Sequence, residues 1–161
     1  MRQGCRTGLG EGVVSHFEIT TVVAAPPRQV FDACLDVEAH TRSMASSREH
    51  AVDGVTQGKL ALGEMVTFQA RHFGLTWRLT ARITSWDPPH SFVDEQEAGP
   101  FQYWRHAHHF APHGQGGTLM TDVIDFASPL GPLGRLADAT VLNRYMPRLI
   151  RSRNAYLAAT L

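Results

Sequence analysis

Lysine is nearly absent from this chain of 161 residues, and neither sign of charge is in excess. Lys59 is the only lysine, and it follows Gly58 in a polar segment typical of a turn. A buried lysine that forms a Schiff base is therefore not expected. Lysine and arginine together number 15 and are balanced by 15 acidic residues, so the chain lacks the basic surface that a nucleic-acid backbone requires. We expect no nucleic-acid partner.

Cysteine and long apolar runs are scarce as well. The two cysteines, Cys5 and Cys34, form neither a disulfide framework nor a zinc-binding spacing. No apolar run approaches the roughly 20 residues that cross a bilayer, and residues 1–12 lack the apolar segment of a secretory signal. We expect a cytoplasmic protein, monomeric or homodimeric, that does not insert stably into a membrane.

The rest of the composition is that of an ordinary globular protein, with 43% apolar and 19% charged residues. The length fits one domain. Residues 1–14 contain several glycines and few apolar residues that could anchor them. We therefore expect a flexible N-terminal tail at residues 1–14, followed by a single domain at residues 15–161.

Hydrophobic periodicity predicts an α+β fold: one strand, two short helices, about six further strands and one long terminal helix. The expected strands are residues 16–24, 49–57, 63–73, 75–86, 91–97, 101–111 and 118–127, and the expected helices are residues 29–35, 36–44 and 130–161. Pro147 cannot donate a backbone hydrogen bond, so we expect a kink in the terminal helix at residues 144–146.

Alternation along the strands gives the predicted sheet one apolar face and one polar face. The terminal helix is expected to pack on the apolar face, which is concave, because no other element can cover it. A curved sheet around a single helix leaves a gap that favours a binding pocket. By the same alternation, Trp86 falls on the polar face or near a turn. The arginines of the terminal helix, Arg144, Arg148, Arg151 and Arg153, are expected to form a solvated face, with an anion-binding or membrane-surface patch as the alternative.

The chain has nine histidines, and five of them lie between His90 and His113. In the strand at residues 101–111, alternation places His106 and His108 on the inner face together with Trp104 and Phe110, and His109 on the outer face. His90 and His113 fall in turns. If Phe110 pairs with Thr118 of the next strand, His106 lies opposite Asp122. A carboxylate beside an imidazole fixes its tautomer and raises its basicity, which suits general acid–base chemistry.

Three interpretations of these side chains remain open. His106 and Asp122 can be a structural pair that satisfies itself in the core and shapes a pocket. They can instead be catalytic. A metal site is the third option, with His106 and His108 joined by His72 or Asp122 as a third ligand. Because no spacing defines that third ligand, we expect no metal ion and no other cofactor.

Several ordered segments resemble one family. They are VVAAPPRQVF at residues 22–31, WDPPHSFVDE at 86–95, GPF at 99–101, WRHAHHF at 104–110, GGTLMTD at 116–122 and PLGPLG at 129–134. Together they resemble the START-like superfamily, also called SRPBCC or Bet v 1-like, and in particular its polyketide cyclase/dehydrase and lipid transport group. The resemblance covers residues 16–158. It implies a helix-grip fold, in which a curved antiparallel sheet of about seven strands wraps round a long C-terminal helix.

The resemblance also implies that the protein binds a hydrophobic small molecule, such as a lipid, a polyketide or an isoprenoid, in an internal cavity between the sheet and that helix. The alternative is a polyketide cyclase or dehydratase without a redox cofactor, in which His106 acts as general acid or base and Asp122 orients it. The candidate ligand-binding residues are Phe68, His72, Trp77, Asp94, Trp104, His108, Phe110, Met120 and Tyr145.

Overall fold

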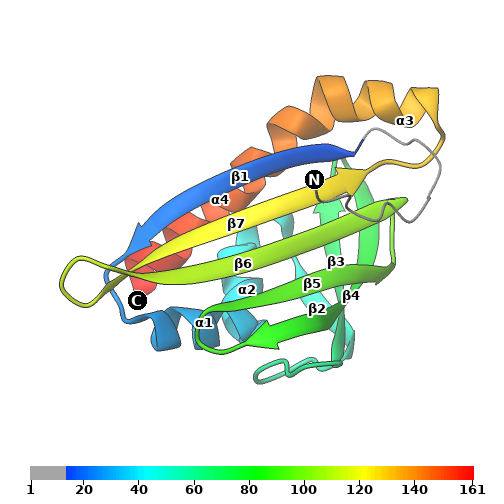
Figure 1. The fold of residues 1–161 in the computed structure, drawn as a ribbon. Helices are drawn as coiled ribbons and strands as arrows, with labels where there is room; N and C mark the ends of the chain where they lie inside the picture. Colours follow the sequence, from blue (N-terminus) through cyan, green and yellow to red (C-terminus); the bar gives the residue numbers. More distant parts are fainter. Residues whose placement is uncertain (1–13) are drawn as a thin grey trace, which may run out of the picture.

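The computed structural model describes residues 14–161, so the predicted tail at residues 1–14 lies outside the described part of the chain except for Val14. Seven antiparallel strands form one sheet in the order β1-β7-β6-β5-β4-β3-β2 (Figure 1). The strands are β1 (Ser15–Val23), β2 (His50–Gly54), β3 (Met65–His72), β4 (Leu75–Asp87), β5 (Ser91–Ala98), β6 (Tyr103–His113) and β7 (Gly117–Ala127). The helices are α1 (Pro27–Leu35), α2 (Val37–Ser43), α3 (Pro132–Ala137) and α4 (Asn143–Thr160), with a short 3₁₀ turn at Ala45–Ser47.

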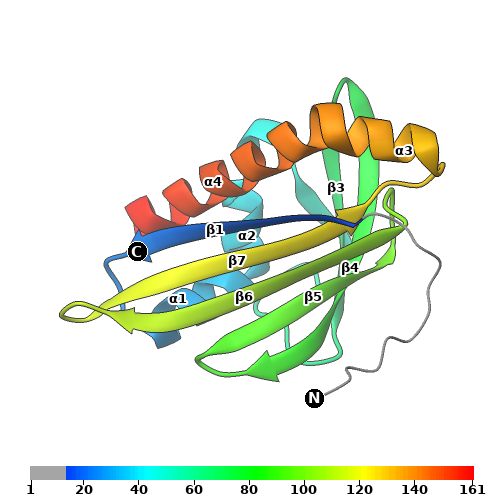
Figure 2. The same cartoon turned by 45° about the horizontal axis from the view of Figure 1, so that its top comes forward.

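The helices surround one side of a curved sheet. Helices α3 and α4 run along the sheet as one long element, and α1 and α2 lie on the same side of the sheet (Figure 2). The alternation in strand β7 explains why the helices cover this face of the sheet. Every second residue is fully buried, and these are Met120, Asp122, Ile124 and Phe126, whereas the residues between them are half-buried. This is the predicted helix-grip fold of the α+β class.

Local sequence features explain where the two short helices begin. Pro27 starts α1, a position where the missing N–H of proline is not needed. Val30 and Phe31 on this helix are buried in the core. The Asp36 carboxylate accepts a hydrogen bond from the Ala39 N–H at 2.7 Å and caps α2.

The terminal helix departs from α-helical geometry one turn earlier than predicted. A π-helical turn at Asp138–Leu142 joins α3 to α4, whereas Pro147 lies inside α4. The kink expected at residues 144–146 lies inside the continuous helix α4, and the change of helix type comes before it. The π turn ends next to Asn143, whose carbonyl is the group that the missing N–H of Pro147 leaves without a helical partner.

The buried apolar side chains form two clusters. One surrounds Phe31 and includes Phe110 and Met120, and the other includes Trp104 and Phe126 beneath α4. Along the inner face of β6 and β7, the buried side chains between these clusters are His106, His108 and Asp122. Polar residues therefore separate two apolar regions in the middle of the sheet.

The register of the β6–β7 hairpin differs from the expected one by two residues. Phe110 pairs with Met120 rather than Thr118, so His108 lies opposite Asp122 and His106 lies opposite Ile124. The strands extend to the His113–Gly117 pair, which leaves only residues 114–116 in the turn. Because the shift is an even number of residues, every side chain stays on its predicted face.

Trp86 lies next to the turn after β4, as one alternative expected, but it is not on the polar face, and a β-bulge is the reason. The pairing of β4 with β5 shifts between Ile83 and Ser85, which reverses the alternation for the rest of β4. Trp86 is consequently half-buried and packs against Phe31, with ring centroids 6.4 Å apart.

Candidate functional site

A cavity of about 700 Å³ lies between the sheet and the helices. Most of its walls are apolar, including Val66, Ala81 and Ile83 from the sheet and Met146 and Ile150 from α4. Its volume falls within the range of sites that bind small molecules.

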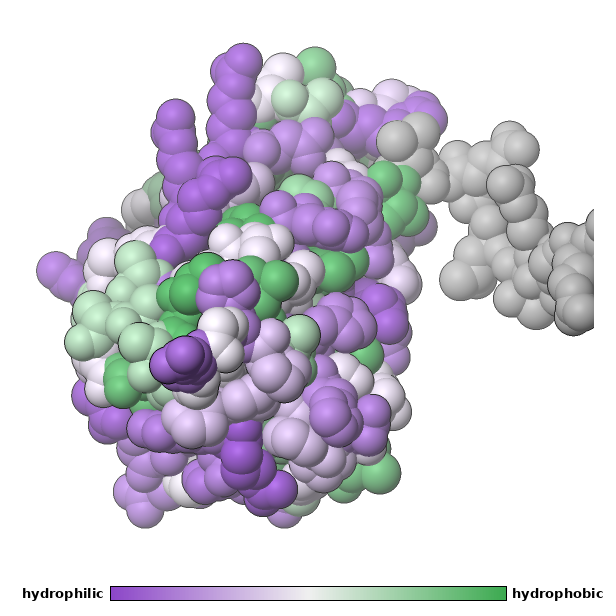
Figure 3. Space-filling model, turned by 60° about the vertical axis from the view of Figure 1, so that its left-hand side comes forward, coloured by the Kyte–Doolittle hydropathy of each residue, from purple (hydrophilic) through white to green (hydrophobic). Residues whose placement is uncertain are grey.

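Apolar side chains continue from the wall of the cavity to the surface. Phe73 follows β3, Trp77 lies on β4, and Leu130 and Leu133 lie at the start of α3. Their exposed fractions are 60%, 38%, 77% and 70%. We call these four residues the apolar mouth. By contrast, the end of the molecule with the β6–β7 hairpin and the C-terminus is mainly hydrophilic, with hydrophobic side chains in small areas (Figure 3).

Most of the predicted ligand-binding residues line this cavity. They are Phe68, His72, Trp77, Asp94, Trp104, His108 and Tyr145, together with His106. Phe110 and Met120 do not line it. Phe31 of α1 packs against Phe110 with ring centroids 5.6 Å apart, and the Cys34 thiol lies 3.7 Å from the Met120 sulfur. Helix α1 therefore occupies the space next to Phe110 and Met120, where the cavity was expected.

Asp122 is the centre of a buried polar cluster. Its side chain has no exposed surface, and its Oδ1 accepts a hydrogen bond from His106 Nε2 at 2.8 Å. His108 Nδ1 lies 3.1 Å from the same oxygen, but off the line that a hydrogen bond requires. Helix α4 supplies two further partners: Asn154 Nδ2 donates to Oδ2 at 2.6 Å, and the Arg153 guanidinium lies 3.5 Å from Oδ1. We call Asp94, His106, His108, Asp122, Arg153 and Asn154 the polar cluster.

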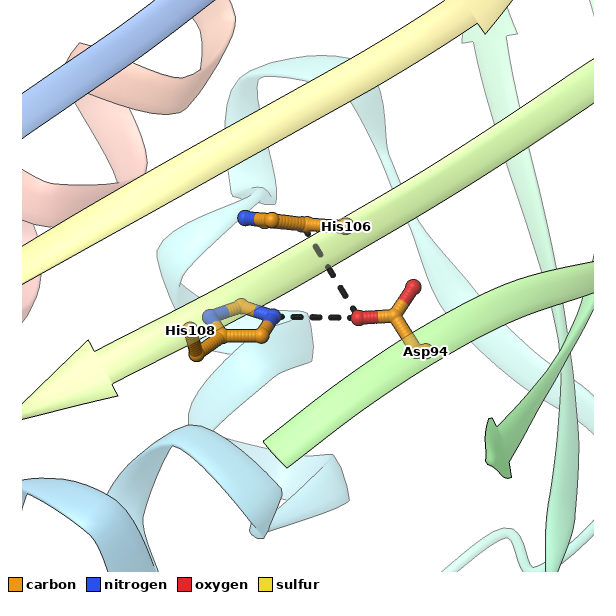
Figure 4. A group of neighbouring side chains, drawn as sticks. All are labelled: Asp94, His106 and His108. Carbon is orange, nitrogen blue, oxygen red and sulfur yellow. Dashed lines mark hydrogen bonds and ion pairs between the residues drawn. The ribbon is translucent and has the colours of Figure 1, made fainter. Parts of the chain in front are cut away.

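Asp94 of β5 completes the cluster on the cavity side (Figure 4). Its Oδ2 lies 3.0 Å from His108 Nε2 and 3.9 Å from His106 Nδ1. The two imidazole rings pack against each other with centroids 3.8 Å apart, and His108 stacks on Phe92 at 4.1 Å. Each imidazole therefore lies between two carboxylates, a buried one behind it and a partly exposed one in front.

The pKa values of the two imidazoles are shifted in opposite directions. Burial lowers the pKa of His106, and the charge of the adjacent His108 lowers it further. Burial also acts to lower the pKa of His108, but its contacts with Asp122 and Asp94 outweigh burial and raise this pKa above the usual value. A neutral His106 beside a charged His108 is the state that these shifts favour.

The two carboxylates remain ionised. Burial acts to raise the pKa of Asp122, but the hydrogen bond from His106 and the contact with His108 hold it well below its usual value. The pKa of Asp94 is lowered as well, because the hydrogen bond from His108 and the charges of both imidazoles oppose the effect of burial. The two imidazoles and the Arg153 guanidinium thus supply the partners that buried carboxylates need.

Arg153 and Asn154 are the members of the cluster that the sequence analysis missed. Arg153 was expected on a solvated face, yet it is 3% exposed. The signal was present in the helical spacing, because Met146, Ile150 and Leu157 occupy the buried face of α4 and Arg153 follows the same period. Arg144, Arg148 and Arg151 are exposed, as expected.

Two further polar contacts border the cavity. His72 Nδ1 and the Tyr145 hydroxyl are 2.6 Å apart and join the end of β3 to α4. His40 of α2, also missed from the sequence, bonds Glu49 at 2.5 Å and stacks on Phe68. His90, His109 and His113 are exposed and border no cavity wall in the described part of the chain.

The comparisons with known proteins agree with this fold. A family described as polyketide cyclase/dehydrase and lipid transport matches residues 15–161. No curated protein sequence matches the chain. Among residues 14–161, no helix combines the length and the apolar character needed to cross a membrane.

Three solved structures illustrate the likeness. The protein TTHA0849 from Thermus thermophilus has a TM-score of 0.71 at 16% identity, covering 91% of this chain and 100% of its own. The Zhui aromatase/cyclase from Streptomyces sp. R1128 has a TM-score of 0.65 at 16% identity, covering 89% and 93%. A START superfamily protein from Mycobacterium smegmatis has a TM-score of 0.62 at 16% identity, covering 88% and 98%. At these identities the structures establish the fold alone.

Proposed function

Because the chain belongs to the polyketide cyclase/dehydrase and lipid transport family, we propose that it binds a hydrophobic small molecule, a lipid, polyketide or isoprenoid, in the cavity beneath α4. The apolar walls supply affinity through burial of the ligand's hydrocarbon surface. The side chains of Asp94, His106 and His108 lie on the cavity wall and contact the polar group of the ligand.

One observation carries this proposal: a large cavity with mostly apolar walls has the buried imidazoles of His106 and His108 and the Asp94 carboxylate side by side on its wall. Phe68, Trp77 and Trp104 border the cavity without closing it. Asp94 keeps 18% of its side chain exposed, whereas Asp122 behind the imidazoles has none. These polar side chains on an otherwise mostly apolar wall can orient a ligand in the cavity.

The test is to fill the cavity and to measure what it holds. Ala81→Phe places a ring on the cavity wall, and Ala155→Phe on the exposed face of α4 is the matched control. We expect the first variant to bind the fluorescent fatty acid cis-parinaric acid several-fold more weakly than the control. Native mass spectrometry of the purified wild-type chain should show a co-purified hydrophobic molecule. Equal probe affinity in both variants would overturn the proposal.

Cyclisation or dehydration of a polyketide is the second candidate, and the geometry of His106 favours it. Since Asp122 accepts the hydrogen bond from Nε2, the lone pair of His106 is on Nδ1, which faces Asp94 at the cavity wall. A neutral imidazole of this kind can take a proton from the carbon next to a ketone. The resulting enolate attacks a second carbonyl of the same chain, that oxygen receives the proton, and loss of water follows.

A kinetic separation tests this second candidate. With a synthetic linear poly-β-keto thioester as substrate, His106→Ala should lose turnover by a much larger factor than it loses affinity for cis-parinaric acid. His109→Ala, on the outer face of the same strand, is the control. An equal loss of binding and turnover in His106→Ala would contradict a role in catalysis.

A further inference from the structure

Three potential metal ligands converge at the polar end of the cavity. One ligand atom from each of Asp94, His106 and His108 lies within 4.8 Å of the other two. Asp94 Oδ2 is 3.0 Å from His108 Nε2 and 3.9 Å from His106 Nδ1 (Figure 4). They come from the adjacent strands β5 and β6, where Asp94 pairs directly with His106. We propose that these three side chains form a site for a divalent transition-metal ion. This site does not depend on whether the cavity binds a hydrophobic ligand.

The groups behind the imidazoles are arranged as a metal site requires. A histidine that binds a metal through one ring nitrogen usually directs the N–H of its other nitrogen to a carboxylate. His106 Nε2 donates to Asp122 at 2.8 Å, and His108 Nδ1 lies 3.1 Å from the same carboxylate oxygen. The remaining nitrogens, His106 Nδ1 and His108 Nε2, are the two that lie on the side of Asp94.

His108 Nδ1 provides a second, independent observation. This atom is buried in a residue that is 2% exposed, and among residues 14–161 it has no partner with hydrogen-bond geometry. A buried N–H that is left without a bond is costly. A small rotation of the ring would align it with Asp122, and coordination of Nε2 in front of the ring supplies a reason for such a rotation.

Asp122 itself is not available as the third ligand, although the sequence suggested it. Its oxygens already accept hydrogen bonds from His106, Asn154 and Arg153, and His108 Nδ1 lies 3.1 Å from Oδ1. His72, the other ligand suggested by the sequence, bonds the Tyr145 hydroxyl and is not among the converging groups. Asp94 takes that place because it lies one strand further along the sheet on the same face.

Two imidazoles and one carboxylate indicate the kind of metal. This donor set is typical of non-haem Fe(II) and of catalytic zinc, and it leaves coordination positions open for a ligand. The open positions face the cavity, because all three ligands are among its lining residues. Two neutral imidazoles and one carboxylate would leave a bound divalent ion with a net positive charge. An anionic oxygen of a bound molecule, such as a carboxylate or an enolate, would balance it.

The site makes a prediction that separates it from the catalytic role of His106. A lone pair on His106 Nδ1 cannot bind a metal ion and accept a substrate proton at the same time. Metal binding is therefore measured first and without substrate, on the full chain carrying no histidine tag.

Calorimetry with zinc chloride is the direct test. We expect one Zn²⁺ per wild-type chain, and loss of this stoichiometric binding in Asp94→Asn and in His108→Ala. His109→Ala removes an exposed histidine from the same strand and should bind as the wild type does. If Asp94→Asn binds Zn²⁺ as tightly as the wild type, or if His109→Ala loses the ion, the proposed ligand set is wrong.

A second measurement needs no variant and so remains decisive if the variants fold poorly. Cobalt chloride added to the ¹⁵N-histidine-labelled wild-type chain should broaden or shift the ring signals of His106 and His108 and leave His109 unchanged. Unaffected His106 and His108 signals would overturn the proposal. Binding of cis-parinaric acid to chelator-treated protein is measured in parallel, so failure of the metal site and failure of the ligand-binding proposal give different results.

Discussion

The polar cluster and the apolar mouth border the same cavity, yet they differ in burial and in the number of interactions that hold them. Asp122 and His108 are 0% and 2% exposed, whereas Leu130 and Leu133 are 77% and 70% exposed. Four strands and α4 contribute hydrogen bonds or ion pairs to the cluster, from Thr21 on β1 to Asp94 on β5. The side chains of Leu130 and Leu133 can form no such bonds.

The difference shows how stability and function are distributed in this protein. A buried ionic network is strongly destabilised when one member is lost, because the remaining charges stay unpaired in a medium of low dielectric constant. Exposed apolar side chains contribute little to folding but offer contact area to a ligand. Changes to the cluster should therefore alter the free energy of unfolding, and changes at the mouth should alter ligand binding.

The largest effect is expected from Asp122→Ala. It leaves both imidazoles, Arg153 and the Asn154 amide without their shared acceptor, so we expect a loss of about 3–5 kcal/mol in the free energy of unfolding. Asp125→Ala is the control on the same strand, because Asp125 pairs with His16 and Arg105 nearer the surface and should cost about 0–1 kcal/mol. Urea denaturation measures the free energy of unfolding of both variants. Similar losses would show that the polar cluster contributes no more to stability than the ion pairs of Asp125.

An intermediate effect is expected where the sheet meets α4 beside the mouth. Tyr145→Phe removes the hydroxyl that lies 2.6 Å from His72, and should cost about 0.5–1.5 kcal/mol of unfolding free energy. Tyr156→Phe on the same helix removes a hydroxyl for which no bond is found in the described residues, and should leave stability unchanged. Thermal denaturation by circular dichroism compares the two variants. Equal midpoints would mean that the contact with His72 adds nothing.

The smallest effect on stability, with a clear effect on binding, is expected at the mouth itself. Leu133→Ser should change the free energy of unfolding by no more than about 0.5 kcal/mol, because the side chain is exposed. The same change should weaken binding of cis-parinaric acid, since Leu133 lines the cavity. Leu62→Ser is the control, as Leu62 is 58% exposed and does not line the cavity. If both variants bind the probe equally, the mouth takes no part in binding.

Strand periodicity was enough to predict which inner side chains meet. It placed His106, His108 and Asp122 on the inner face of adjacent strands, and that placement survived a register error because the error was two residues rather than one. The residue directly opposite Asp122 could not be predicted, because it depends on where the hairpin turn begins. The turn is three residues long, shorter than the glycine-rich segment suggested.

Hydrophobic periodicity could not predict features that depend on a single local irregularity. Alternation assumes unbroken pairing between neighbouring strands. Because the pairing of β4 with β5 has a bulge after Ile83, Trp86 lies on the inner face of the sheet rather than on the polar face. Pro147 indicated strain in the terminal helix but not where the helix would absorb it. Arg153 was missed for another reason: its charge was given more weight than its position on the buried face of α4.

Asp122 also joins two parts of the molecule that are otherwise separate in function. The same carboxylate receives the imidazoles of β6 and two side chains of α4, so the charge state of the cavity and the attachment of the C-terminal helix share one acceptor. By thermodynamic linkage, anything that binds at the imidazoles changes how firmly α4 is held, and any movement of α4 changes affinity at the imidazoles by the same free energy. A molecule bound at the imidazoles would therefore be detected as a change in the hydrogen-exchange protection of α4.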